Sequence, residues 1–328
     1  MTEPIQLDLS ELEQAARLVY QVMPPTPFYA WPKLKARTGA TVWVKHENHT
    51  PTGAFKVRGG IVYVDRLRRE RAHVPGIITA TRGNHGQSLA FSAARAGLKA
   101  VIYVPKGNSP DQNSAIAGFG ARLVEFGKDF DEARHEAARL AESEGLEFVP
   151  SFHRDLVAGV ASYALELFRA GQPLDSVYVG VGMGSGICGL IAARDALGLK
   201  TEIVGVSPVS APANADSFEA KRPVPSASSR TFADGLATRE PGDAAVATMV
   251  RGAARFVRVS EDEIAESVRA YFDDTHQVVE GAGAAPLAAL LKDRARMAGK
   301  QVGLVVSGGN IERERFKLLL SGATPQVA

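Results

Sequence analysis

The chain has 328 residues, enough for one large α/β unit or for two domains that share a cleft. Its 38 basic and 36 acidic residues leave a net charge of +2, and no long run of one sign indicates a nucleic-acid or membrane partner. The single cysteine, Cys188, excludes an internal disulfide and suits a reducing compartment. The start lacks a signal-peptide pattern and no apolar run approaches the roughly 20 residues of a membrane span, so we expect a cytoplasmic protein.

Strand-like runs alternate with helical patterns along the chain. The runs are nearly continuous in apolar residues, which is typical of parallel strands buried on both faces. They are TVWVKHE (41–47), GIITA (76–80), KAVIYVP (99–105), ARLVEFG (121–127), SVYVGVG (176–182), TEIVGVS (201–207) and QVGLVVSGG (301–309). The helical patterns are residues 85–97, 129–145, 185–198, 261–275 and 283–299. Ser260 followed by Glu263 predicts a capping box at one helix start.

Alternation of this kind implies parallel sheets that are covered by helices. The strand-like runs are too many for one sheet of ordinary width, so we predict two α/β layers. Residues 208–232 are rich in Pro, Ser and Ala and are expected to form a long surface excursion.

The segment GVGMGSGICG, residues 180–189, lies between a strand and a helix. Glycines at 182, 184 and 186 allow backbone N–H groups to crowd one small volume, and the helix N-terminus adds the positive end of its dipole. This pattern predicts a phosphate cradle. The run GSGICG also matches a dinucleotide-binding pattern, so a nicotinamide-dependent oxidoreductase is an alternative, but the next strand ends at Ser207 and not at the acidic residue that would bind a ribose.

Lys56 stands in the stretch GAFKVRGG, where the flanking glycines would let the backbone approach a bound group closely. Lys45 and Glu47, by contrast, end an apolar run where charged side chains are expected to reach water. Two further polar, glycine-rich loops follow strands, TRGNHGQS (81–88) and SGGN (307–310). Because ligands bind at the carboxyl ends of parallel strands, we expect these loops and the lysine to meet in one crevice.

This set of groups indicates a particular chemistry. A lysine amine, a cradle for one phosphate and loops that carry Ser, Asn and Thr suit a phosphorylated aldehyde that is held as a Schiff base. Pyridoxal 5'-phosphate is such a molecule, and a lysine Schiff base is its usual link to protein. We therefore expect it as the cofactor, attached to Lys56, with Phe55 offering an apolar face to its ring.

The chain resembles the serine/threonine dehydratase family of pyridoxal-phosphate enzymes, called fold type II or tryptophan synthase β-like. The resemblance covers about residues 25–316 and depends on four motifs in order: GAFKVRG, TRGNHG for an S-x-G-N-H loop, GMGSG and SGGN. It implies two open, twisted, parallel-type sheets with flanking helices and a cofactor in the crevice between two domains. The larger domain would be residues 1–67 and 151–328, and the smaller, mobile one residues 68–150. A homodimer is also implied.

The resemblance also implies roles for the motif residues. Lys56 would hold the cofactor and later remove the Cα proton of the substrate, and Ser307 would face the pyridine nitrogen. The other expected cofactor-binding residues are Phe55, Asn84, Gly182, Met183, Gly184, Ser185, Gly186 and Glu280. The expected substrate-binding residues are Thr81, Arg82, Gly83 and His85.

Ser307 favours elimination over transamination. A serine, unlike an aspartate, does not hold a proton on the pyridine nitrogen, so the ring is a weaker electron sink and loss of a β-substituent becomes the easier route. The predicted reaction converts a 3-hydroxy amino acid, such as L-threonine or L-serine, into a 2-oxo acid and ammonia. The alternatives are a dehydratase for phenylserine or threo-3-hydroxyaspartate, a serine or aspartate racemase, a sulfhydrylase-like β-replacement enzyme and an inactive sensor of amino acids.

Two departures from the family and two aromatic residues bear on the substrate and on a bound cation. Arg82 stands where relatives carry Ser or Ala. Arginine is a poor proton relay, which disfavours a racemase, and Arg82 either pairs with a carboxylate or points to solvent. Phe218 and Phe232 would enlarge a pocket for phenylserine. Ser207 and Ser217 occupy the positions of acidic cation ligands in relatives, so no metal is expected.

Overall fold

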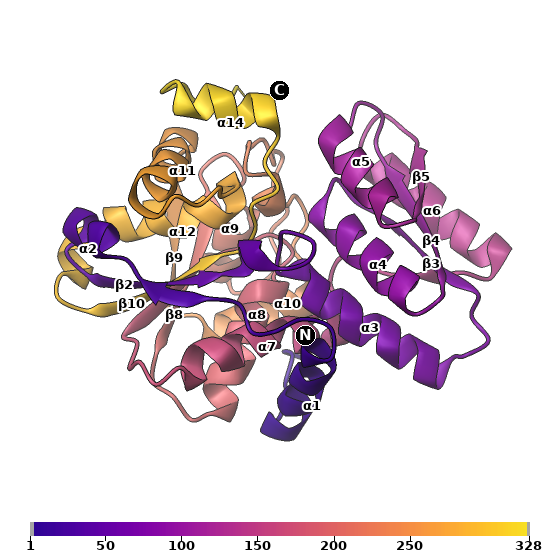
Figure 1. The fold of residues 1–328 in the computed structure, drawn as a ribbon, viewed down its shortest axis with the longest axis horizontal. Helices are drawn as coiled ribbons and strands as arrows, with labels where there is room; N and C mark the ends of the chain where they lie inside the picture. The colour runs from indigo at the N-terminus through magenta and orange to yellow at the C-terminus, as the bar shows by residue number, and fades with distance from the viewer. Residues whose placement is uncertain (1–2, 327–328) are drawn as a thin grey trace.

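The computed structural model describes residues 3–326, and two β-sheets with flanking helices form its frame (Figure 1). The strands are β1 (Phe28–Ala30), β2 (Thr41–His46), β3 (Gly76–Ala80), β4 (Lys99–Val104), β5 (Arg122–Glu125), β6 (Glu147–Phe148), β7 (Ser176–Gly180), β8 (Glu202–Pro208), β9 (Arg255–Val259) and β10 (Gln301–Val306). The larger sheet has the order β1-β2-β10-β7-β8-β9, and the smaller sheet has the order β5-β4-β3-β6.

Neighbouring strands pair in parallel except β1, which runs antiparallel to β2 at the edge of the larger sheet. The predicted fold class, two open sheets of parallel type with flanking helices, is confirmed with this one addition. The apolar runs did not predict β1 and β6, which have three and two residues, or β9, whose sequence RFVRV is interrupted by charges. All four strands of the smaller sheet lie within residues 68–150, although the domain limits themselves stay a prediction.

Fourteen α-helices and two short 3-10 helices occur within residues 3–326. They are α1 (Leu9–Tyr20), α2 (Pro32–Thr38), α3 (Lys56–Glu70), α4 (Asn84–Arg95), α5 (Pro110–Gly118), α6 (Phe130–Glu144), α7 (Arg154–Arg169), α8 (Ser185–Ala196), α9 (Ala213–Ala220), α10 (Asp243–Gly252), α11 (Glu261–Thr275), α12 (Gly281–Lys292), α13 (Arg294–Met297), α14 (Arg313–Leu320), η1 (Glu47–His49) and η2 (Asp234–Leu236). The predicted capping box is confirmed at α11, where Ser260 Oγ accepts from Glu263 N at 3.2 Å and the Glu263 carboxylate accepts from Ser260 N at 2.7 Å. Among these helices none is long and apolar enough to cross a bilayer.

Helix α3 joins the two halves of the molecule, because it packs on α7 beside the larger sheet and on α4 beside the smaller one (Figure 1). Two glycines make these contacts possible. A Cβ on Gly59 would lie 2.7 Å from a backbone oxygen of α7, and a Cβ on Gly60 would lie 2.8 Å from Ser92 Oγ of α4. Gly59 and Gly60 therefore serve helix packing, which corrects the expectation that they bring the backbone close to a bound group.

The expected surface excursion at residues 208–232 is only partly a loop. Its middle forms α9, and Asn214 in the first turn of that helix is 1% exposed. Phe232 is buried in the core beside the larger sheet, and the Phe218 ring packs on Phe256 with centroids 5.0 Å apart. Both rings are used in core packing, and the larger pocket for phenylserine stays a prediction.

Candidate active site

Lys56 is the first residue of α3 and follows a tight loop. Thr50 closes the loop, because its Oγ1 accepts from Ala54 N and donates to Ala54 O, both at 2.9 Å, and Gly53 has a φ of 67° that favours glycine. The Lys56 amine lies 5.4 Å from the centroid of the Phe55 ring. Burial lowers the pKa of Lys56 to about 8, so part of the amine is unprotonated and nucleophilic at neutral pH.

The SGGN motif runs beside the lysine loop. Phe55 N donates to Ser307 O at 3.0 Å, and Gly309 N donates to Gly53 O at 2.9 Å, which together form a short antiparallel bridge. Ser307 lies just beyond β10 and is 7% exposed. The two predicted catalytic residues, Lys56 and Ser307, thus stand on adjoining segments of backbone.

The glycine loop, residues 182–186, reaches the same place. A Cβ at Gly186 would lie 3.8 Å from Cζ of Phe55, and Tyr163 OH donates to Gly186 O at 2.9 Å. Gly184 adopts a φ of 97°, in the region where a side chain is strained. The loop, with its Met183 and Ser185, therefore lies close to the Phe55 ring, and its turn at Gly184 requires glycine.

Unpaired donors crowd this loop. No protein group of residues 3–326 accepts a hydrogen bond from the backbone N–H groups of residues 182–186, and Ser185 Oγ is buried without a partner in the same part of the chain. Buried donors normally find an acceptor, and consecutive N–H groups at a helix N-terminus bind anions. The loop therefore fits one phosphate group.

Asn84, the first residue of α4, reaches across to the half that contains the larger sheet. Its Nδ2 donates to the two Glu280 carboxylate oxygens at 2.9 and 3.2 Å, and its Oδ1 accepts from Asn310 Nδ2 at 2.8 Å. Asn310 Nδ2 also donates to Thr52 O at 2.8 Å, and Asn310 O accepts from Gln112 Nε2 at 3.0 Å. Asn310 belongs to the SGGN loop, which was expected in the crevice, although no role was predicted for this residue. Gln112 lies outside every motif and was not predicted.

The loop from Thr81 to His85 suits a carboxylate. Thr81 Oγ1 accepts from Gly83 N at 3.1 Å and from Gly86 N at 3.3 Å, which leaves its own proton free for a ligand. His85 Nε2 is buried and has no partner in the described chain. Burial and the nearby Lys56 amine lower the pKa of His85 to about 3, so the ring is neutral at pH 7. The N-terminus of α4 adds a favourable dipole for an anion.

Arg82 is the one predicted substrate-binding residue of this loop that is exposed. Its backbone oxygen accepts from Asn108 Nδ2 at 3.2 Å, while its guanidinium makes no hydrogen bond or ion pair within residues 3–326. A free guanidinium beside the loop remains available to an incoming carboxylate.

In the stretch where a cation site was considered, residues 207–219, the carboxylates are engaged by an arginine. Ser207 Oγ, just inside β8, is buried and lacks a partner among the described residues. The nearby carboxylates of Asp216 and Glu219 are engaged by Arg258, at 2.7 and 2.6 Å. Residues 3–326 contain no group of three His, Cys, Asp or Glu side chains placed to hold a metal.

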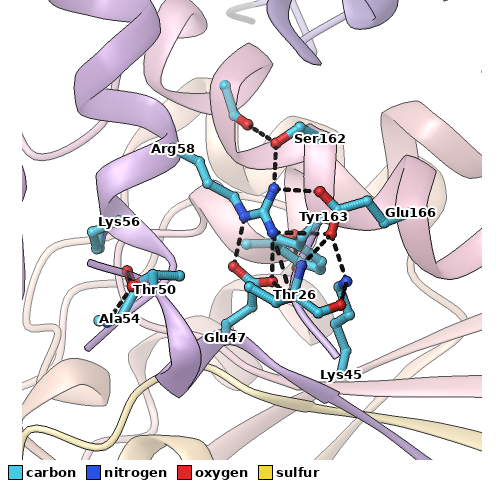
Figure 2. Close-up of polar contacts among 12 residues, drawn as sticks. Thr26, Lys45, Glu47, Thr50, Ala54, Lys56, Arg58, Ser162, Tyr163 and Glu166 are labelled. Atoms are coloured by element: carbon cyan, nitrogen blue, oxygen red, sulfur yellow. Dashed lines mark hydrogen bonds and ion pairs between the residues drawn. The ribbon is translucent and has the colours of Figure 1, made fainter. Parts of the chain in front are cut away.

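Lys45 and Glu47 do not reach water, which contradicts the sequence expectation, since their exposed fractions are 1% and 0%. The Arg58 guanidinium lies between Glu47, at 2.7 Å, and Glu166, at 2.6 Å, and Lys45 Nζ donates to Glu166 at 2.5 Å (Figure 2). Two cations face two carboxylates, so the cluster has no net charge. Because Arg58 belongs to the same helix turn as Lys56, this charge cluster ties the start of α3 to β2 and α7.

These observations define a class of site. A half-buried amine of lowered pKa, an adjoining apolar ring and a cradle of unpaired N–H groups fit an aldehyde, an aromatic ring and a phosphate that belong to one molecule. Such a site is typical of an enzyme that holds a carbonyl cofactor through lysine.

Comparison with known proteins gives the family. The family described as pyridoxal-phosphate dependent enzyme matches residues 19–308, and the chain belongs to it. Pyridoxal phosphate is therefore the cofactor, and the nicotinamide alternative drawn from GSGICG is wrong.

Relatives within this family are enzymes of amino-acid metabolism. The chain is 33% identical over 297 residues to the biosynthetic L-threonine dehydratase IlvA of Salmonella typhimurium. The aligned stretch covers 89% of this chain, and the chain spans only 57% of the length of that relative. It is 32% identical over 298 residues to an L-threo-3-hydroxyaspartate ammonia-lyase of a Pseudomonas species, covering 90% of this chain and 93% of the relative. The processed form of threonine deaminase isoform 2 from Solanum lycopersicum superposes with a TM-score of 0.89, at 27% identity, over 98% of this chain and 96% of that chain. The chain has the fold of type II pyridoxal-phosphate enzymes.

Proposed function

We propose that the protein is a dehydratase that converts a 3-hydroxy amino acid, with L-threonine and L-serine as the first candidates, into a 2-oxo acid and ammonia. The observation that carries the proposal is the position of Ser307, a residue with a neutral side chain, next to the lysine loop, where the family resemblance puts the pyridine nitrogen. The names of two relatives, a threonine dehydratase and a 3-hydroxyaspartate ammonia-lyase, support the same class of reaction.

The residues of the site have separate roles in the reaction. Pyridoxal phosphate, when bound, supplies an aldehyde for amine exchange and a ring that withdraws electrons from the substrate Cα. Lys56 removes the Cα proton. Its pKa of about 8 means that the protonated and unprotonated forms of its amine are both present at physiological pH. Thr81, with the start of α4, binds the substrate carboxylate. Ser307 holds no proton on the ring nitrogen, which favours departure of the β-hydroxyl.

The reaction balances without an oxidant or a reductant. The substrate loses its Cα proton and its β-hydroxyl together as one water molecule. The released enamine takes up one water molecule and yields the 2-oxo acid and ammonium.

A panel of L- and D-3-hydroxy amino acids, assayed for both 2-oxo acid and ammonia, tests this proposal. We expect equal amounts of the two products from at least one L-substrate and none with Lys56→Ala, which also loses the visible absorbance of the bound cofactor. Release of 2-oxo acid by Lys56→Ala, or no release from any member of the panel by the wild type, would refute the proposed activity.

Threo-3-hydroxyaspartate is a second candidate substrate. The free, exposed guanidinium of Arg82 is suited to a second carboxylate, and a relative aligned over 93% of its length carries that activity. The same panel distinguishes the candidates through their kcat/KM values.

The family resemblance also supports a cytoplasmic homodimer in which residues 68–150 move against the rest of the chain. Light scattering after size exclusion tests the dimer. Hydrogen exchange with and without substrate tests the movement. If residues 68–150 move onto the substrate, exchange at the start of α4 should be slower once substrate is bound.

A further inference from the structure

Asn214 connects α9 to the glycine loop. Its side chain is buried, and Nδ2 donates to the carbonyl oxygens of Val181 at 3.2 Å and of Gly182 at 2.9 Å. These are the two peptide groups that lead from β7 into the glycine loop. Asn214 lies in residues 208–232, the predicted surface excursion, and belongs to none of the motifs.

The planarity of the peptide bond gives this contact a consequence. In a trans peptide the carbonyl oxygen and the amide hydrogen point in opposite directions. When Asn214 holds the oxygens of Val181 and Gly182 on its own side, the N–H groups of Gly182 and Met183 must point away from α9. These are two of the N–H groups for which residues 3–326 provide no acceptor.

The loop needs such an anchor because glycine permits many backbone conformations. The anchor itself is firmly held. Ser217 Oγ, one turn along α9, accepts from Val224 N at 2.9 Å and donates to Ala213 O at 2.6 Å. Arg258 in β9 holds the same helix through Asp216 at 2.7 Å. A braced helix can therefore fix the orientation of a loop that is intrinsically flexible.

We infer that Asn214 is a positioning residue for the cofactor phosphate: by holding two carbonyl groups it aims the N–H groups of Gly182 and Met183 at the phosphate. The inference rests on the placement of the phosphate at residues 182–186 in the proposed function. It does not depend on which amino acid is the substrate.

The test compares pyridoxal phosphate with pyridoxal, which lacks the phosphate. Cofactor-free wild type, Asn214→Asp and Asn214→Ala are titrated with each compound, and binding is followed by the absorbance of the lysine-linked form. Asn214→Asp keeps the shape of the side chain but removes the donor, so we expect its affinity for pyridoxal phosphate to fall at least tenfold while its affinity for pyridoxal stays within about twofold. Asn214→Ala should behave in the same direction.

Thr38→Ala is the control, because it also removes buried hydrogen bonds of a side-chain hydroxyl, but from α2, which contacts neither α9 nor the glycine loop. Its preference for the phosphorylated compound should equal that of the wild type. An Asn214 variant that retains the wild-type preference would overturn the inference, and so would a variant that loses both affinities equally. A wild type with no preference would instead overturn the phosphate placement, whereas a wild type with the preference but without ammonia release would refute only the dehydratase activity.

Discussion

Asn84 Nδ2 and a Glu280 carboxylate oxygen lie 2.9 Å apart, and this hydrogen bond links the start of α4 to the residue that precedes α12. Burial raises the pKa of Glu280 from its ordinary value of 4.5 to about 7, against the opposing effect of the Asn84 donor. Between these two values the folded chain keeps a proton that the unfolded chain has released. The contribution of Glu280 to the free energy of unfolding therefore depends on pH.

We expect Glu280 to make the cofactor-free protein less stable as pH rises. The unfolded state binds fewer protons at this site than the folded state from pH 4.5 to 7, so the free energy of unfolding falls, by up to about 3 kcal/mol across that range. Glu280→Gln removes the titration. In urea unfolding at several pH values, the free energy of unfolding of the variant should rise relative to that of the wild type as pH rises. A difference between the two proteins that is independent of pH would contradict the raised pKa.

The lowered pKa of Lys56 predicts the pH dependence of cofactor uptake. Only the unprotonated amine attacks the aldehyde, so the uptake rate of the cofactor-free protein should rise about tenfold per pH unit below 8 and level off above it. Stopped-flow absorbance measures this rate. A profile that keeps rising to pH 10 would mean that burial does not perturb the amine.

Gly184 should be needed for the cofactor, not only for the fold. Alanine at its φ of 97° costs about 1–2 kcal/mol of stability and brings a Cβ to 3.0 Å from the Ala245 Cβ, which displaces the cradle. Gly198→Ala is the control, because Gly198 has a φ of 65° and nothing within 4 Å of an added Cβ. We expect both variants to lose stability in thermal unfolding and only Gly184→Ala to lose affinity for pyridoxal phosphate.

The sequence predicted those parts of the molecule that local patterns encode. Continuous apolar runs located seven strands, and the glycine-rich ends of those strands located Lys56, Ser307 and the glycine loop, which the fold brings together. The Lys45 side chain was misjudged because the partner that neutralises it, Glu166, comes from a helix far along the chain. Asn214 was missed for the same reason, since its importance comes from a contact with a distant loop and not from its neighbours in sequence.

Arg82 should affect the choice of substrate and not the general chemistry. Its guanidinium has no partner within residues 3–326, so Arg82→Ser removes no internal interaction of that side chain. We expect kcat/KM for threo-3-hydroxyaspartate to fall at least tenfold, while kcat/KM for L-serine changes by less than about threefold. Equal losses for both substrates would show that Arg82 does not select for a second carboxylate.

Arg58 should be the most costly cation to remove from the charge cluster. It is fully buried and contacts both carboxylates, so Arg58→Met leaves Lys45 as the remaining cation of the charge cluster (Figure 2). An uncompensated buried charge of this kind costs about 3–5 kcal/mol. Urea unfolding of the complete enzyme measures the loss as a lower midpoint with an unchanged slope.

Arg255 provides the control for this change, because it also lies between two carboxylates, Asp293 at 2.5 Å and Glu202 at 3.0 Å, but is partly exposed. Water can solvate the carboxylates that Arg255→Met leaves behind, so its loss should be about 1 kcal/mol. If the two variants lose the same stability, burial is not what makes Arg58 essential. If Arg58→Met also slows cofactor uptake while Arg255→Met does not, the charge cluster positions Lys56 in addition to stabilising the fold.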